Sequence, residues 1–444
     1  MMKTPIIDFV RQYKNKNSIR LHMPGHKGKK LLGFEDYDIT EIDGADVLYH
    51  SDGIILESEK NASLLFSSHT FYSAEGSSLC IRAMLFLAMS KNNSSNKPYI
   101  LAARNVHKTF VTALALLDLD VKWLYSKDSI SYHSCHITKE MVEEELKNSK
   151  ELPLAVYLTS PDYLGYIADI KGISSVCRKY NILLLVDNAH GAYLKFLNPS
   201  LHPIDLGADM CCDSAHKTLP AVTGAAYLHI SNNIDGYYSL HAKEALALFA
   251  STSPSYLILQ SLDYANLYLD NNKDIYNSFC CKLHNIKEEL INNGYTIIGD
   301  EDIKITIDAR KYGYTGNEIN DYLLENNIAS EFHDNDYIVL MMTPENTDVE
   351  LNKMKEALLK LNKKEELKRI NFIPTIKEAS MSIREATFSL RERVKVEDSL
   401  GRILADTTVS CPPAIPIVVS GERIDSKDIE MFKYYGIEEC TIVK

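Results

Sequence analysis

Residues 211–220 read Cys-Cys-Asp-Ser-Ala-His-Lys-Thr-Leu-Pro, and here an apolar run ends in a small polar segment that carries His216 and Lys217. Thirty positions before Lys217, the apolar residues 183–186 lead into Asp-Asn-Ala-His, which begins with Asp187. Short apolar runs of this kind are typical of strands buried in an α/β sheet. Open α/β sheets bind ligands at the carboxyl ends of such strands. The two stretches together predict a lysine and an aspartate at neighbouring strand ends.

The same pattern recurs on both sides of these stretches. Short apolar runs predict strands, and periodic segments between them predict helices, for example at 57–66 and 79–89; the strands are expected at 70–73, 99–103, 154–158, 182–186, 208–212 and 225–230. Apolar strands separated by helical stretches indicate a mainly parallel sheet covered on both faces. The fold class that we expect is therefore α/β.

The chain has 444 residues, which is too long for one compact core. We expect four parts: an N-terminal arm without sustained periodicity at 1–60, a large domain at 61–270, a smaller α+β domain at 271–365 and a C-terminal extension at 366–444. One long helical connector is expected at 256–290, strands at 303–307 and 337–342, and a helix at 376–391. The segment around Lys217 shows little helical or strand character.

Composition narrows the class of protein. The net charge of −12 argues against a nucleic-acid-binding surface and is compatible with a cationic substrate. Nine cysteines without a CxxC pattern indicate reduced thiols. No signal-peptide core and no apolar run of membrane-spanning length is present, so we expect a cytoplasmic protein without a membrane partner. His133 and His136 flank Cys135, but without a second ligand cluster we interpret this stretch as a loop and expect no metal.

A lysine and an aspartate at adjacent strand ends are the two fixed points that a pyridoxal phosphate enzyme needs. The lysine amine holds the cofactor as an imine, and the carboxylate keeps the pyridine nitrogen protonated so that the ring accepts electrons. For Lys217 alone the alternative is a surface lysine, and for Asp187 it is a helix cap. Because four apolar residues precede Asp187, its carboxylate is expected to be partly buried and to need a partner.

Other residues add to this hypothesis. Ser77 and Ser78 follow Gly76 between a predicted strand and a predicted helix, where hydroxyls and free N–H groups form a phosphate seat; ordinary serine capping is the alternative. His107 follows a buried strand, where its ring could lie over a flat heterocycle, or it is a surface loop histidine. His190 is close enough in sequence to Asp187 to flank the same site.

With these pieces in place, the chain resembles the Orn/Lys/Arg decarboxylases, which are fold-type I pyridoxal phosphate enzymes, in a short bacterial form without the wing domain. The resemblance covers nearly the whole chain, and its most specific stretches are 21–27 (Leu-His-Met-Pro-Gly-His-Lys), 104–108, 187–191, 214–219, 251–256, 412–416 and 421–422. It implies an aspartate aminotransferase-like large domain. Asn188 departs from the pattern, because related chains often have Glu there, and Ala414 stands where Gly is usual.

The resemblance also implies roles for individual residues. Lys217 would be the imine lysine and Asp187 the pyridinium partner, with His107 stacked on the ring and Ala189 beneath it. The remaining cofactor residues would serve the phosphate or its surroundings; they are Ser77, Ser78, His190, Ser214, His216, Ser251 and Thr252. Ser251 or Thr252 matches a position that reaches the phosphate from the neighbouring subunit, which implies a homodimer or a higher homo-oligomer.

The function expected from these roles is decarboxylation of a basic amino acid, a lyase reaction that feeds polyamine biosynthesis. Arginine to agmatine is our first choice, then lysine to cadaverine and then ornithine. Glu422 is the candidate carboxylate for the cationic side chain, and a solvated turn residue is its alternative. An aminotransferase or aldolase on the same fold stays open, with Arg310 as the arginine that an aminotransferase would need. A non-catalytic binding protein is the third hypothesis, and retention of both Lys217 and Asp187 speaks against it.

Overall fold

A computed structural model describes residues 2–92, 96–126, 129, 131–370, 377, 379–407 and 414–444. The chain divides into two compact units, and each unit is built from two separate stretches of sequence. Unit 1 comprises Met1–Asn93 and Cys177–Ile275, and unit 2 comprises Ser94–Val176 and Tyr276–Lys444. The expected division into four parts stays a prediction.

The large sheet has seven strands and is mostly parallel. In unit 1 its order is β1 (His69–Ser73), β7 (Ala226–Ile230), β6 (Met210–Asp213) and β5 (Leu183–Asp187). In unit 2 its order is β4 (Ala155–Thr159), β2 (Tyr99–Ala103) and β3 (Asp120–Leu124). Strands β5 and β6 are parallel, as are β2 with β3 and β2 with β4. The expected α/β class is therefore confirmed.

Two details of this sheet differ from expectation. Strand β7 continues the predicted series but is antiparallel to both β6 and β1. The connection between β6 and β7 contains only the four-residue helix α8 (Ala215–Thr218), so the chain reverses direction instead of crossing over to a parallel position. Strand β3 was not predicted, because the strands expected in this sheet were uniformly apolar runs, whereas β3 (Asp-Val-Lys-Trp-Leu) alternates polar and apolar residues and its Asp120 and Lys122 are exposed.

Three helices pack together in unit 1: α1 (Pro5–Asn15), α2 (Ile54–Phe66) and α11 (Tyr256–Asn271). Asp263 of α11 is buried and accepts hydrogen bonds from the backbone N–H groups of Ile6 (3.0 Å) and Ile7 (3.1 Å) and from Ser58 Oγ (2.6 Å). A carboxylate from a distant helix thus satisfies the first N–H groups of α1. These hydrogen bonds explain why a helix forms within residues 1–60, the N-terminal arm in which no sustained periodicity was found.

The predicted connector at 256–290 is two helices, because α11 ends at Asn271 and α12 (Ile275–Asn292) begins after a three-residue break. The remaining helices of unit 1 are η1 (Leu48–His50), α3 (Ser77–Ser90), η2 (Ala192–Phe196), α7 (Pro203–Leu206), α9 (Gly236–Leu240) and α10 (Ala242–Ala247). Helix α6 (Ile170–Lys179) contains the boundary between the units. In unit 2, α4 (Lys108–Leu117) follows β2, and α5 (Lys139–Asn148) precedes β4.

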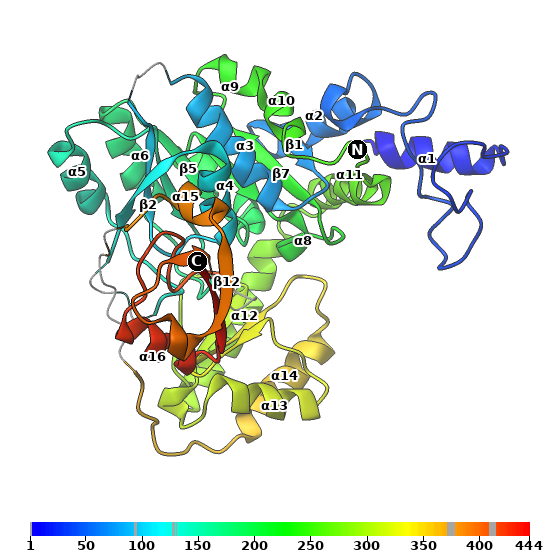
Figure 1. The fold of residues 1–444 in the computed structure, drawn as a ribbon. Helices are drawn as coiled ribbons and strands as arrows, with labels where there is room; N and C mark the ends of the chain where they lie inside the picture. The colour runs from blue at the N-terminus through cyan, green and yellow to red at the C-terminus, as the bar shows by residue number, and fades with distance from the viewer. Residues whose placement is uncertain are drawn as a thin grey trace. The chain divides into compact units, whose positions relative to one another are not determined.

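Unit 2 contains two further sheets. One has the order β10 (Phe332–His333), β11 (Tyr337–Met341), β9 (Lys304–Asp308) and β8 (Ile297–Ile298), and all of its pairs are antiparallel. Helices α13 (Gly316–Glu325) and α14 (Asp348–Lys360) belong to the same part of the chain and lie beside each other (Figure 1). The strands near 303–307 and 337–342 are confirmed as β9 and β11.

The other sheet, β12 (Arg391–Lys395), β14 (Glu439–Val443) and β13 (Leu404–Asp406), is antiparallel and was not predicted. Its apolar core includes Val396, Phe432 and Ile442. Helices α15 (Ile383–Phe388) and α16 (Ser426–Tyr434), with η3 (Arg310–Tyr312) and η4 (Val396–Ser399), complete unit 2. The helix predicted at 376–391 is shorter than expected, because α15 ends at Phe388 and Arg391 already belongs to β12; residue 376 lies outside the described residues.

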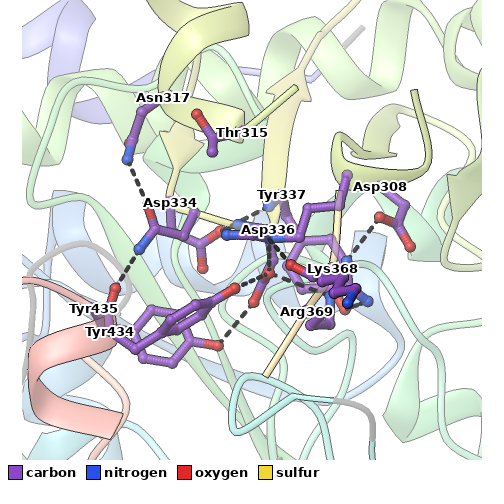
Figure 2. Close-up of polar contacts among 12 residues, drawn as sticks. Asp308, Thr315, Asn317, Asp334, Asp336, Tyr337, Lys368, Arg369, Tyr434 and Tyr435 are labelled. Carbon is purple, nitrogen blue, oxygen red and sulfur yellow. Dashed lines mark hydrogen bonds and ion pairs between the residues drawn. The ribbon is translucent and has the colours of Figure 1, made fainter. Parts of the chain in front are cut away.

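Asp336 is the centre of a polar network in unit 2, shown in Figure 2. Its carboxylate accepts hydrogen bonds from Arg310 Nε (2.7 Å), Arg369 Nε (3.2 Å), Tyr434 Oη (2.6 Å) and Tyr435 Oη (3.1 Å). Because Tyr434 ends α16 and Arg369 follows α14, the network attaches both segments to the β9–β11 sheet. A buried carboxylate with this many donors has its hydrogen-bonding capacity satisfied within the fold.

Candidate active site

Lys217 lies on the short helix α8, directly after β6. Its Nζ atom is 2.8 Å from Nε2 of His190, a buried residue in the loop after β5. The parallel pairing of β5 and β6 places Asp187 opposite Cys212, so both loops start at the same edge of the sheet. The expected juxtaposition of the two strand ends is therefore observed. The segment around Lys217 is helical, contrary to the sequence-based interpretation.

Asp187 is the last residue of β5 and is only 3% exposed. Its Oδ1 atom accepts a hydrogen bond from the Ala189 backbone N–H at 3.2 Å and a weaker one from Cys212 Sγ at 3.7 Å. Burial, and then the Asp187 charge, raise the pKa of the Cys212 thiol well above its ordinary value, so the thiol stays protonated and can donate. A carboxylate buried to this degree is stabilised by a cationic ligand such as a pyridinium.

The start of helix α3 provides an anion-binding geometry. Ser77 is its first residue, and Gly76 precedes it with a φ of 71°, a conformation that favours glycine. Ser214, at the end of β6, donates a hydrogen bond from Oγ to Ser77 Oγ at 2.9 Å. Hydroxyls from two elements thus meet at the N-terminus of helix α3, next to Ser78, and a helix N-terminus is a position at which phosphate groups bind in proteins.

These donors can be compared with what pyridoxal phosphate presents. Within unit 1 there is an amine for the aldehyde, a buried carboxylate for the pyridine nitrogen, and hydroxyl and N–H groups for the phosphate. Ala189 lies between Asp187 and His190 in the loop after β5 and is half-buried; its place beneath the ring stays a prediction. The residues present therefore fit this cofactor.

Other predicted cofactor residues of unit 1 have different surroundings. His216 uses Nδ1 to bind the carbonyl oxygen of Ala225 at 2.9 Å, a contact that holds the α8 connection to the start of β7. Ser251 and Thr252 are exposed in the single chain. The Ser251 backbone N–H donates to Glu75 Oε1 at 2.6 Å, so the exposed loop is attached to the turn just before α3. Glu75 was not predicted to have a role, although this residue lies in the same turn as Gly76.

His107 and Glu422 belong to unit 2. His107 is half-buried and is the N-cap of α4, where Nδ1 accepts a hydrogen bond from the Thr109 backbone N–H at 3.2 Å. Glu422 is 3% exposed, which excludes the alternative of a solvated turn residue. Its Oε2 atom accepts from the Val419 backbone N–H at 2.7 Å and lies 3.4 Å from Arg104 Nη2.

Arg104 and Glu422 line a cavity of about 190 Å³ in unit 2, together with residues of the β3 end and of α16. Arg104 also donates to the backbone carbonyls of Pro416 (2.9 Å) and Ile417 (3.0 Å), so its guanidinium is held in place. The buried amide of Asn105 and the hydroxyl of Tyr125 face this cavity region without hydrogen-bond partners. Arg104 was missed as a partner of Glu422, although it follows a predicted strand as Asp187 does.

Arg310, the arginine that an aminotransferase would need, is engaged elsewhere. Its Nε atom binds Asp336 at 2.7 Å, and its Nη1 atom binds the backbone carbonyl of Lys368 at 2.5 Å. Arg310 therefore has a structural role, because it belongs to the network around Asp336. This removes the residue on which the aminotransferase alternative depended.

The fold and the grouping of Lys217, Asp187 and the Ser77 turn define a pyridoxal phosphate enzyme of the α/β type. Comparison with known families identifies which one. The family model described as Orn/Lys/Arg decarboxylase, major domain, matches residues 4–298, and the one described as Orn/Lys/Arg decarboxylase, C-terminal domain, matches residues 340–441. The chain thus belongs to the Orn/Lys/Arg decarboxylase family and is a pyridoxal-phosphate-dependent amino-acid decarboxylase.

Curated relatives are similar over nearly the whole chain. Arginine decarboxylase of Bacillus anthracis is 28% identical, covering 97% of this chain and 92% of the relative. The uncharacterized protein YaaO of Bacillus subtilis (strain 168) is 27% identical, with 97% and 93% covered. Among solved structures, the Francisella novicida lysine decarboxylase LdcF has a TM-score of 0.82 at 16% identity, covering 100% of this chain and 81% of that one. The structural likeness shows a shared fold.

No helix in the part of the chain that the structure describes is both long and apolar enough to cross a membrane.

Proposed function

We propose that this decarboxylase acts on a basic amino acid and that arginine, giving agmatine and CO₂, is its first substrate, ahead of lysine and then ornithine. The observation that carries the proposal is the family match, which fixes the reaction class. Curated relatives from Bacillus anthracis and Halalkalibacterium halodurans, both named arginine decarboxylase, support the choice of arginine at 28% and 27% identity. The net charge of −12 is compatible with a cationic substrate.

In this proposal each residue has a defined task. When bound, pyridoxal phosphate supplies the electron-accepting ring that receives the electrons of the broken bond between Cα and the carboxylate. Lys217 provides the amine that attaches the cofactor, and Asp187 holds a proton at the pyridine nitrogen. Ser77, Ser78 and Ser214 bind the phosphate. His190, 2.8 Å from the Lys217 amine, orients that amine by a hydrogen bond.

Glu422 is the proposed partner of the substrate side chain. A carboxylate can bind a guanidinium through two parallel hydrogen bonds, whereas an ammonium makes a less directional contact. Arg104 Nη2 lies 3.4 Å from Glu422 Oε2, so in this proposal the substrate guanidinium shares the carboxylate with Arg104 and binds chiefly through Oε1. Because such a contact persists through the reaction, Glu422→Gln is expected to raise KM for arginine much more than it lowers kcat.

The matched control is Glu430→Gln, because Glu430 lines the same cavity but is exposed. Its KM for arginine is expected to stay near that of the wild type. A Glu422→Gln variant with unchanged KM would show that Glu422 does not bind the substrate.

The substrate proposal is tested by product analysis. Arginine, lysine and ornithine are supplied at equal concentrations with pyridoxal phosphate, and agmatine, cadaverine and putrescine are quantified over time. Agmatine is expected to form fastest. If cadaverine or putrescine forms faster, the choice of arginine is wrong while the decarboxylase class stands.

A further inference from the structure

A buried cluster in unit 1 surrounds Asp213, the last residue of β6. Its Oδ2 atom is 3.1 Å from Nε2 of His202 and 3.1 Å from Nε2 of His229, and its Oδ1 atom accepts a hydrogen bond from Asn188 Nδ2 at 2.6 Å. All four side chains are fully buried. Three N–H donors from three different segments thus bind the Asp213 carboxylate, which has no role in the reaction proposed for this protein.

The geometry assigns the protonation of this cluster. Burial alone would raise the pKa of the Asp213 carboxyl, but the two imidazoles hold it well below its ordinary value. Burial lowers the pKa of His229, so this imidazole is neutral and presents Nε2–H to the carboxylate. Its Nδ1 atom is then an acceptor, and Thr70 Oγ1 lies 2.9 Å from it as the donor. Each contact around His229 is thereby satisfied with a single tautomer.

The same atoms raise the question of a metal, because ligand atoms of His202, Cys211 and Asp213 lie within 4.8 Å of one another. A histidine that binds a metal through one ring nitrogen usually donates its other N–H to an acceptor. Nδ1 of His202 is buried and has no hydrogen-bond partner, so a metal on Nε2 would leave a buried N–H unsatisfied. With Nε2–H donating to Asp213, Nδ1 of His202 is instead an unprotonated acceptor, and Nε2 makes a 3.1 Å contact with the carboxylate. We therefore interpret the cluster as a hydrogen-bond network.

The network touches the cofactor site through Asn188. This residue lies between Asp187 and Ala189, and it is attached at two points: its backbone N–H donates to the Cys212 carbonyl at 3.0 Å, and its side chain donates to Asp213. Asp213 is also followed directly by Ser214 and by the helix that carries Lys217. One carboxylate therefore connects the loop that contains Asp187 and His190 with the segment that contains Lys217.

We propose that Asp213 is a positioning residue for the cofactor: through Asn188 it holds the loop at 187–190 against the end of β6, so that His190 meets Lys217 and Asp187 keeps its place. This inference rests on the proposed use of pyridoxal phosphate by Lys217 and Asp187. It also gives a physical role to Asn188, whose amide donates to Asp213. With Asp213 as the acceptor, an amide donor at position 188 completes the pair.

The test exchanges the two partners. The amide of Asp213→Asn has two possible orientations. In one, its NH₂ group faces the NH₂ group of Asn188, and in the other its NH₂ group faces the two imidazole N–H groups. A donor therefore faces a donor in either orientation. In Asn188→Asp, two carboxylates face each other. In the double variant Asn188→Asp/Asp213→Asn, the amide donates to Asp at position 188 while its oxygen accepts from both imidazoles, and all contacts are restored.

The readout is the dissociation constant of pyridoxal phosphate for the apoprotein, measured by fluorescence titration together with the absorbance of the lysine-bound cofactor. Each single variant is expected to bind roughly tenfold or more weakly, the size of one unsatisfied buried hydrogen-bonding group, and the double variant to return to within about threefold of wild type. Asn188→Ala, which keeps the carboxylate bound to both imidazoles, provides a second variant if Asp213→Asn does not fold, and the same loss is expected.

Asp263→Asn controls for general destabilisation, because Asp263 is a buried carboxylate of the same unit that binds α1 and α2 instead of the cofactor loops. Its melting temperature is expected to fall without a change in cofactor affinity.

Three results of the titrations would overturn the inference: wild-type affinity in the single variants, an equal loss of affinity in Asp263→Asn, or no recovery of affinity in the double variant. One equivalent of zinc in the purified protein would also overturn it. A wild-type chain that binds no pyridoxal phosphate would instead refute the proposed function.

Discussion

Asp334 offers a prediction about stability whose sign and size follow from its surroundings (Figure 2). Its Oδ1 atom accepts hydrogen bonds from the backbone N–H groups of Asp336 and Tyr337, both at 2.7 Å. Its Oδ2 atom is buried without a hydrogen-bond partner, and burial raises the pKa of this carboxyl to about 7. His133 Nδ1 lies 3.8 Å away, but burial lowers the pKa of His133 to about 3, so the imidazole is neutral and forms no ion pair.

The sign follows from proton binding. An unfolded aspartate has a pKa of about 3.9, so between about pH 4 and pH 7 the folded protein binds more protons at this position than the unfolded chain does. The contribution of Asp334 to the free energy of unfolding is therefore present at low pH and is lost as the pH rises through 7. A shift of three pKa units corresponds to roughly 4 kcal/mol as an upper bound, and relaxation of the site reduces this to about 2–4 kcal/mol.

Asp334→Asn keeps the Oδ1 acceptor and removes the charge. The variant is expected to be more stable than wild type by only about 1 kcal/mol at pH 4.5, where the unfolded carboxyl has just begun to ionise, and by about 2–4 kcal/mol at pH 8. Guanidinium unfolding followed by circular dichroism at both pH values measures the difference. Glu325→Gln, at an exposed position of α13, is the control and should show no such dependence on pH. An equal stability difference at pH 4.5 and pH 8 would refute the reasoning.

Two predictions concern catalysis. In Asp187→Ala, kcat should fall by at least about a hundredfold, because fixed electrostatic interactions in a water-excluded site contribute on the order of 3 kcal/mol. The melting temperature should change little. A near-normal kcat with the cofactor bound would exclude the proposed role of Asp187 at the pyridine nitrogen. If Ser251 and Thr252 of one subunit bind the phosphate of the other, mixing Lys217→Ala with a Ser251→Ala/Thr252→Ala variant should restore activity. Verified hybrid dimers without activity would argue for self-contained sites.

The sequence was informative where one local pattern determines the structure. The apolar runs before Asp187 and Lys217 predicted β5 and β6, and the polar residues after them were expected at one sheet edge, where His190 and Lys217 are in contact. Period-2 and all-apolar patterns depend on residues close in sequence, so they can be recognised without knowledge of the fold. Specific stretches, among them 21–27, 187–191 and 214–219, were also enough to suggest the family.

What could not be predicted depends on partners far apart in the chain. Helix α1 is stabilised at its N-terminus by Asp263, which is more than 250 residues away in the sequence. The residues around the start of α1 do not indicate that a distant carboxylate accepts hydrogen bonds from its first N–H groups. The antiparallel direction of β7 follows from the short connection after β6. Strand propensity does not indicate the direction in which a strand runs. Asp336 accepts hydrogen bonds from arginines and tyrosines of three segments that are far apart in the sequence, so the structural role of Arg310 could be recognised only in the folded chain.

The central claim is that Lys217 attaches pyridoxal phosphate in the site between β5 and β6. Borohydride reduction of the protein with bound cofactor, followed by proteolysis and mass spectrometry, tests it directly, because reduction makes the bond between the lysine and the cofactor permanent. The phosphopyridoxyl group is expected on the peptide that contains Lys217, and Lys217→Ala should show no modification there. Stoichiometric labelling of a different lysine in the wild-type protein would contradict the claim.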